Sequence, residues 1–206
     1  MICVPNIEVF TGCMFAGKTR RLIERCRGLE REGLVVHVVK PARDTRYAVR
    51  QVVSHDGQSI AATDVDETHY RELVSADVLA IDEAQFFSRE VLEHWFSNLS
   101  LSHVIAAGLD LDWRGEPFGP MPWLFCVATK VTKLRAVCKC GAPACRTRLT
   151  VPPAMAVESN VIVGGAEMYA PKCLGCYAGA QNPSGPVQSL TPAHPHNPPS
   201  QPESDS

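Results

Sequence analysis

One short segment of the chain carries residues that can bind phosphate. It reads Gly-Cys-Met-Phe-Ala-Gly-Lys-Thr and fits the pattern G-x-x-x-x-G-K-[ST]. In such loops backbone N–H groups point at phosphate oxygens, the lysine adds a positive charge near the β- and γ-phosphates, and the threonine hydroxyl can ligate Mg²⁺. An apolar run from Ile7 to Phe10 predicts a strand before the segment, and apolar residues at helical spacing follow from Arg20 to Arg31. This context predicts a P-loop, whose phosphate-binding residues would be Gly12, Cys13, Met14, Phe15, Ala16, Gly17, Lys18 and Thr19.

A second apolar run, Val78 to Ile81, ends in the carboxylates Asp82 and Glu83. A strand ending in acidic residues is expected to complete a P-loop site, with Asp82 holding Mg²⁺ together with Thr19. Glu83 projects differently and could take the proton of an attacking hydroxyl during phosphoryl transfer. The alternative is that both carboxylates only cap a helix from residue 84 to residue 99. Their occurrence beside a P-loop favours Asp82 as a magnesium ligand and Glu83 as the general base.

Two loop segments carry weaker signals. The segment Asp44-Thr45-Arg46-Tyr47 would follow the second strand, where Arg46 could bind a phosphate and Asp44 could join the metal shell through water. A solvated turn with a local ion pair is the alternative. The segment Ser54-His55-Asp56-Gly57 indicates a turn, and its lone histidine is weak evidence of catalysis.

Four of the nine cysteines form two close pairs in the second half of the chain. Cys138-x-Cys140 and Cys173-x-x-Cys176 offer four thiolates, which is the ligand set of a structural, tetrahedral Zn²⁺. The C-x-C spacing is shorter than usual, so Cys145 is an alternative ligand. The isolated thiols are expected to pack as small apolar side chains: Cys3, Cys26 and Cys126.

Strands and helices alternate along the first part of the chain. Apolar, β-branched runs predict buried parallel strands at residues 7–10, 35–39, 78–81 and 104–107. Helical patterns lie at residues 18–33 and 88–99, and residues 124–134 predict a passage from helix to strand. The fold class is therefore α/β, with a mostly parallel sheet. We expect a P-loop domain at residues 1–137, a small zinc-binding domain at 138–178 and a disordered, Pro/Ser-rich tail at 179–206.

Composition narrows the class of protein. The chain has 206 residues, of which 45% are hydrophobic, enough for one main core with a small satellite. A formal net charge of −2 provides no basic field, so nucleic acid is not expected as a partner. The sequence shows neither a membrane-length apolar run nor a secretory signal, which predicts a cytoplasmic protein without a membrane partner. Clustered cysteines in that compartment indicate metal binding rather than disulfides.

Taken together, these segments resemble the type II thymidine kinases over residues 6 to 177. The motifs that carry the resemblance are the P-loop with Met14-Phe15, Asp44-Thr45-Arg46-Tyr47, Ile81-Asp82-Glu83-Ala84-Gln85-Phe86-Phe87, Gly108-Leu109-Asp110 running to Phe118-Gly119, Lys133-Leu134-x-Ala136-Val137-Cys138, Thr147-Arg148-Leu149, and Val163-Gly164-Gly165-Ala166-x-x-Tyr169. The chain departs from the family's pattern in having Cys13 for the usual proline, Ala16 for the usual serine, and C-x-C for the usual C-x-x-C.

The resemblance implies a RecA-like α/β domain, a zinc-bearing lasso domain that closes over the nucleoside, and transfer of the ATP γ-phosphate to the 5′-hydroxyl of thymidine, with Glu83 as the base. It also implies Mg²⁺ with ATP, a homotetramer and feedback inhibition by dTTP. Ala84 and Gln85 would join the ATP site. Residues implied to surround the thymidine are Met14, Phe86, Leu109, Trp113, Phe118, Thr147, Asn160, Val161, Ile162, Val163, Gly164 and Tyr169. Because Cys140 keeps its distance to Thr147, the implied zinc ligands are Cys138, Cys140, Cys173 and Cys176, with Cys145 in reserve.

Two functions of other classes share some of these features. A RecA-like ATPase acting on nucleic acid has the same P-loop and acidic strand end, but it is expected to have a basic surface and usually more chain. A zinc-ribbon binding module with a degenerate P-loop would not need an intact Gly17-Lys18-Thr19 beside Asp82-Glu83. A nucleoside kinase fits the sequence better than either.

Overall fold

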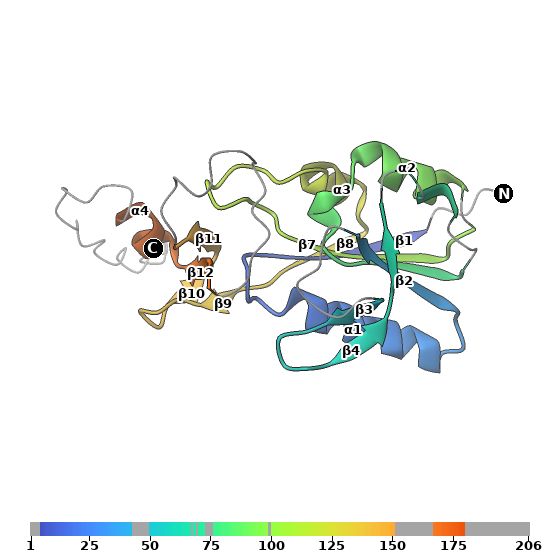
Figure 1. The fold of residues 1–206 in the computed structure, drawn as a ribbon, viewed down its shortest axis with the longest axis horizontal. Coiled ribbons are helices and arrows are strands. Elements are labelled where there is room, and N and C mark those ends of the chain that lie inside the picture. The colour runs from blue at the N-terminus through green and yellow to red at the C-terminus, as the bar shows by residue number, and fades with distance from the viewer. Residues whose placement is uncertain are drawn as a thin grey trace, which may run out of the picture.

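The computed structural model of the chain describes residues 5–42, 50–66, 68, 70–72, 76–98, 100–150 and 167–179. A central sheet with helices on both faces forms the larger part, and short strands with one short helix lie at one end of it (Figure 1). Within the described ranges, no helix has both the length and the apolar character needed to cross a membrane.

Six strands form the central sheet in the order β5-β2-β6-β7-β1-β8, and every neighbouring pair is parallel. Their bounds are β1 Asn6–Thr11, β2 Val36–Pro41, β5 Thr63–Val65, β6 Val78–Ile81, β7 His103–Gly108 and β8 Lys130–Lys133. The four predicted strands are confirmed, and so is the α/β fold class. Strand β5 was not predicted, because the three residues Thr-Asp-Val carry too little apolar sequence to stand out.

Three helices cover the sheet. The helix α1 (Lys18–Arg31) lies on one face, whereas α2 (Arg89–Asn98) and α3 (Met121–Val127) lie on the other (Figure 1). Because successive strand residues point to opposite faces, Val104 and Ala106 of β7 pack toward α2 and α3, and Ile105 and Ala107 pack toward α1. Both faces of the sheet are apolar, as expected of a parallel sheet covered on both sides.

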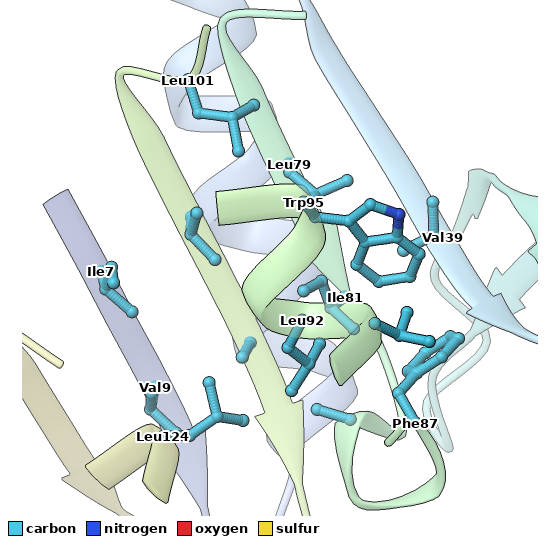
Figure 2. Close-up of a cluster of buried hydrophobic side chains, with 14 of the residues drawn as sticks. Ile7, Val9, Val39, Leu79, Ile81, Phe87, Leu92, Trp95, Leu101 and Leu124 are labelled. Carbon is cyan, nitrogen blue, oxygen red and sulfur yellow. The ribbon is translucent and has the colours of Figure 1, made fainter. Parts of the chain in front are cut away.

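The α2 side of the core is built around Trp95, which is fully buried (Figure 2). Its ring meets Phe87 edge-on with centroids 5.1 Å apart, and its indole N–H donates a hydrogen bond to the carbonyl of Tyr70 at 2.7 Å. A buried indole N–H needs such a partner. Trp95 therefore ties α2 to the 3₁₀ turn η1 (Tyr70–Glu72).

The remaining elements are short. They are a hairpin of β3 (Gln51–Val53) and β4 (Ser59–Ala61), the 3₁₀ turn η2 (Ala84–Phe86), the pairs β9 (Ala136–Val137) with β10 (Pro143–Ala144) and β11 (Arg146–Leu149) with β12 (Tyr169–Lys172), and α4 (Leu174–Gly179). The helix α4 includes residue 179, the first residue of the expected tail. Residues 180–206 lie outside the described residues, so the tail stays a prediction.

The isolated cysteines differ in environment. Cys26 is fully buried on α1, as predicted. The prediction for Cys126 is wrong: this residue is exposed, because α3 turns Met121 and Leu124 toward the sheet instead. Cys3 lies outside the described residues.

We expect Val104→Ala to lower the free energy of unfolding by about 2 kcal/mol, because it removes methyl groups that are fully buried on the central strand β7. The matched control is Val35→Ala, since the Val35 side chain is 62% exposed and should change stability by less than about 0.5 kcal/mol. Urea unfolding of both variants measures the difference. Equal losses of unfolding free energy in the two variants would show that burial of Val104 in the sheet does not stabilise the fold.

Candidate active site

The P-loop connects β1 to α1, as the sequence predicts. Gly12 has a φ of 139° and lies so close to Leu134, the residue after β8, that an added Cβ would be 2.2 Å from the Leu134 carbonyl oxygen. No side chain fits there, which explains the first glycine of the pattern. The Lys18 ammonium donates a hydrogen bond to the carbonyl of Cys13 at 2.8 Å, and burial lowers the pKa of Lys18. The Lys18 ammonium thus lies against the backbone of the P-loop, beside the expected phosphate site.

Thr19 and Asp82 meet where the P-loop approaches β6. The Thr19 hydroxyl donates to the Asp82 carboxylate, with Oγ1 3.3 Å from Oδ1, and Asp82 is buried. A hydroxyl and a carboxylate are oxygen donors of the kind that Mg²⁺ accepts. The two residues therefore fit the expected magnesium site in ligand type.

Glu83 is placed by unusual backbone geometry and by Gln85. Its φ is 52°, in the left-handed region that residues other than glycine seldom adopt. The Gln85 amide, which is buried, donates from Nε2 to Glu83 Oε2 at 2.5 Å, while its Oε1 accepts the backbone N–H of Leu109 at 3.0 Å. Because the Leu109 N–H can only donate, the orientation of the amide is fixed and its NH₂ must face Glu83.

The helix-cap interpretation of the two carboxylates is not supported. The Glu83 side chain makes no capping hydrogen bond to the 3₁₀ turn that follows it. The helix α2 begins only at Arg89, beyond an extended Phe87. The Glu83 carboxylate at the end of β6 therefore does not act as a helix cap.

A cavity of about 350 Å³ lies over the P-loop. Glu83 and Leu109 line it together with residues 14–19, so the expected base and a residue of the expected thymidine set share one cavity. Sequence reasoning missed part of its lining: Arg20, Val53, His55, Asp56, Arg135, Ala136 and Val137. Arg20 could have been found from its position directly after the P-loop. Arg135 is the unspecified position inside the motif Lys133-Leu134-x-Ala136-Val137-Cys138, so it carried no signal.

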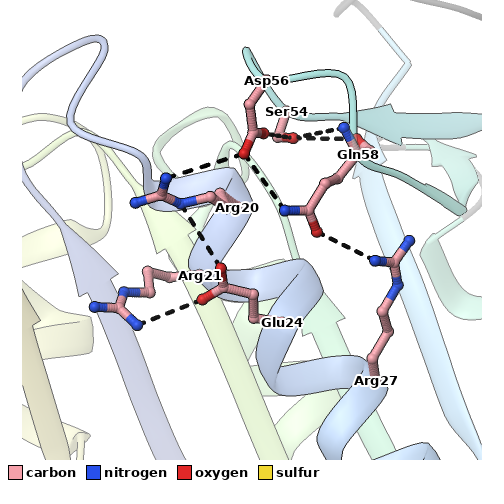
Figure 3. Close-up of polar contacts among 7 residues, drawn as sticks. All are labelled: Arg20, Arg21, Glu24, Arg27, Ser54, Asp56 and Gln58. Atoms are coloured by element: carbon pink, nitrogen blue, oxygen red, sulfur yellow. Dashed lines mark hydrogen bonds and ion pairs between the residues drawn. The ribbon is translucent and has the colours of Figure 1, made fainter.

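The β3–β4 hairpin forms one wall of this cavity because α1 holds its turn in place (Figure 3). The Arg20 guanidinium lies 3.9 Å from Asp56, and Arg27 donates to the Gln58 side chain at 3.1 Å. A hydrogen bond from the Ser54 hydroxyl lowers the pKa of Asp56. The turn predicted at residues 54–57 is confirmed. The ring of His55 in this turn meets the ring of Phe15 in the P-loop edge-on, with centroids 4.9 Å apart.

Aromatic side chains from the expected thymidine set come together beside the site. Phe86 and Phe118 meet edge-on with ring centroids 5.5 Å apart. The carbonyl of Trp113 accepts the hydroxyl of Tyr177 at 3.1 Å, and among the described residues the buried indole N–H of Trp113 has no hydrogen-bond partner.

Of the other residues of the predicted sites, the structure describes some and not others. Thr147 and Tyr169 are buried on the paired strands β11 and β12. The residues outside the described part of the chain are Asp44, Arg46, Asn160, Val161, Ile162, Val163 and Gly164.

Four cysteines form a cluster suited to a metal ion. The Sγ atoms of Cys138, Cys140, Cys173 and Cys176 all lie within 4.8 Å of one another, and Cys145 is not among them. A tetrahedral Zn²⁺ with Zn–S bonds of about 2.3 Å separates its sulfurs by about 3.8 Å, and Cys140 and Cys173 are 3.7 Å apart. The backbone N–H of Cys140 lowers the pKa of Cys138, which favours the thiolate that a metal needs.

The family model of thymidine kinase matches residues 5–177 of the chain. The chain belongs to the thymidine kinase family. Within this family, the thymidine kinase of Bacteroides thetaiotaomicron is 41% identical over 185 residues, which make up 87% of this chain and 90% of that protein. The resemblance seen in the motifs therefore extends over nearly the whole described fold. The P-loop, the acidic end of β6 and the cysteine cluster all fall inside the matched thymidine kinase region.

We expect the purified protein to hold about one zinc ion per chain, because four thiols at this spacing bind it tightly. Cys140→Ser should lose the ion, whereas the matched variant Cys145→Ser should keep it. Elemental analysis after gel filtration measures both. Loss of zinc from Cys145→Ser with retention in Cys140→Ser would reassign the ligand.

Proposed function

We propose that the protein is an ATP-dependent kinase that transfers the γ-phosphate of ATP to the 5′-hydroxyl of thymidine. One observation carries the proposal: the P-loop, Glu83 and Leu109 line the same cavity. A phosphate donor and a nucleoside acceptor can therefore meet beside a carboxylate. Membership of the thymidine kinase family supports thymidine as the acceptor.

The residues of this chain would act mainly by positioning and by charge. The backbone of the P-loop and Lys18 would hold the β- and γ-phosphates, and Thr19 and Asp82 would hold Mg²⁺. When bound, that ion would neutralise phosphate charge. Glu83 would take the proton of the 5′-hydroxyl as the hydroxyl oxygen bonds to the γ-phosphorus and the bond to the β-phosphate oxygen breaks, which leaves ADP and dTMP.

The amide of Gln85 would position the base in this reaction. Its hydrogen bonds connect the Glu83 carboxylate to the backbone of Leu109. Phe86, Phe118 and Trp113 would supply flat apolar walls for the pyrimidine, and the indole N–H of Trp113 is available to a ligand oxygen. The roles of residues 160–164, of Asp44 and of Arg46 stay predictions.

Several wider properties are also proposals. The homotetramer and inhibition by dTTP rest on the family resemblance. The lack of a nucleic-acid partner rests on the net charge of −2, and the cytoplasmic location and the division into domains at residues 137 and 178 rest on the sequence pattern. The structural role of zinc in the lasso domain is proposed from the four-cysteine cluster.

A panel of nucleosides with Mg·ATP tests the proposal. We expect thymidine to be phosphorylated at its 5′ position far faster than purine nucleosides, since the aromatic walls favour a single flat ring. Steady ATP hydrolysis without nucleoside, stimulated by single-stranded DNA, would contradict the proposal and favour the ATPase alternative.

We expect Glu83→Gln to lower kcat by about 10² to 10⁴ while thymidine and ATP still bind, because the amide keeps the shape of the side chain but cannot accept the proton. Calorimetry for binding and a coupled assay for turnover separate the two effects. Near-normal kcat at saturating thymidine would show that Glu83 is not the base.

A further inference from the structure

The P-loop packs directly against the four-cysteine cluster. Cys13, only 1% exposed, lies in one buried cluster with Cys138, Ala136 and Ala144, and Cys173 and Cys176 pack against the same group. The Cys13 thiol donates a hydrogen bond to the carbonyl of Ala144, with the sulfur 3.4 Å from the oxygen. Two segments separated by more than a hundred residues thus share one small core.

A second contact ties the loop to the strands that carry the cysteines. The backbone N–H of Met14 donates to the hydroxyl of Thr147 at 3.0 Å, and Thr147 is 3% exposed. Thr147 pairs with Pro171 of β12, the strand that leads directly into Cys173. The backbone of Met14 in the P-loop is therefore hydrogen-bonded to this module.

The same cysteine also touches the phosphate-binding lysine. The Cys13 carbonyl accepts the hydrogen bond from the Lys18 ammonium at 2.8 Å, while its thiol bonds to Ala144. Cys13 thus contacts both the cysteine module and Lys18. A movement of Ala144 would therefore shift Cys13, whose carbonyl accepts the hydrogen bond from Lys18.

We propose that Cys13 is a positioning residue through which the four-cysteine module sets the shape of the P-loop, so that metal binding at the module tightens the binding of nucleotide phosphates. The inference rests on the proposed function, since it assumes that the P-loop binds nucleotide. Metal binding supplies the free energy that orders a module with little core of its own. The module then holds the loop in the geometry that phosphate requires, which is a coupling between two sites.

The test compares the Kd for Mg·ADP of the zinc-loaded and the zinc-stripped full-length protein by calorimetry. In the wild type we expect zinc removal to weaken Mg·ADP binding by about tenfold, within the usual range of such couplings. Cys13→Ala should weaken binding in the zinc-loaded protein, and zinc removal should then change its Kd by a smaller factor than in the wild type, because only the Met14–Thr147 hydrogen bond still connects the loop to the module. Cys13→Ser, which can still donate to Ala144, should restore much of the coupling.

The matched control is Cys26→Ala, because Cys26 is a buried cysteine on α1 that packs in a different cluster, between α1 and the central sheet. It should keep the wild-type ratio of the two Kd values. By reciprocity, Mg·ADP should tighten zinc binding by the same factor as zinc tightens Mg·ADP binding, and this factor should be smaller in Cys13→Ala than in the wild type. Circular dichroism of the stripped protein reports whether the central sheet remains folded.

Equal Kd values for Mg·ADP with and without zinc in the wild type would overturn the inference, and so would an undiminished ratio in Cys13→Ala. Phosphorylation of thymidine by the zinc-loaded wild type is measured separately. Its failure would count against the proposed function and not against the coupling.

Discussion

The parallel register of β6, β7, β1 and β8 is the constraint on which the site depends. Thr11 at the end of β1 pairs with Gly108 of β7 and with Lys133 of β8, and Ile81 pairs with Ala106. Because parallel strands end on the same side, the segments that follow them meet at one edge of the sheet. The P-loop, the Asp82-Glu83 pair, Leu109 and Leu134 are brought together in this way. Burial of both sheet faces then stabilises the arrangement.

At this edge of the sheet, close contacts between backbone segments fix the positions of the loops. An added Cβ at Gly12 would lie 2.2 Å from the Leu134 oxygen, and one at Gly119 would lie 2.3 Å from the Gln85 oxygen. Both glycines have positive φ values. The first brings the P-loop against Leu134, the residue after β8, and the second brings the segment before α3 against η2. Gln85 is thereby held in the position from which it orients Glu83.

Sequence reasoning predicted the features that local pattern determines. Apolar runs predicted β1, β2, β6 and β7, and the P-loop pattern predicted the turn between β1 and α1. It could not predict contacts that depend on how distant segments meet. Nothing local indicates that Thr147 bonds to Met14 or that the Cys13 thiol bonds to Ala144. The sequence placed the P-loop in the α/β core and the cysteine pairs beside the nucleoside, whereas the structure brings the two into contact.

The choice between Cys140 and Cys145 shows the same limit. Spacing left both open, and only the positions of the sulfur atoms separate them. The turn of the β3–β4 hairpin carried only a weak functional signal, yet it lines the cavity through His55 and Asp56.

The central claim is that the edge of the sheet holds a phosphate donor and a nucleoside on either side of Glu83. A crystal structure of the protein with Mg·ADP and thymidine tests it most directly. The account predicts the β-phosphate within the P-loop and the thymidine 5′-oxygen about 2.6–3.2 Å from the Glu83 carboxylate, pointing toward the vacant γ-phosphate position. A complex in which the 5′-oxygen faces away from Glu83, or in which the nucleoside binds outside the cavity shared with the P-loop, would contradict it.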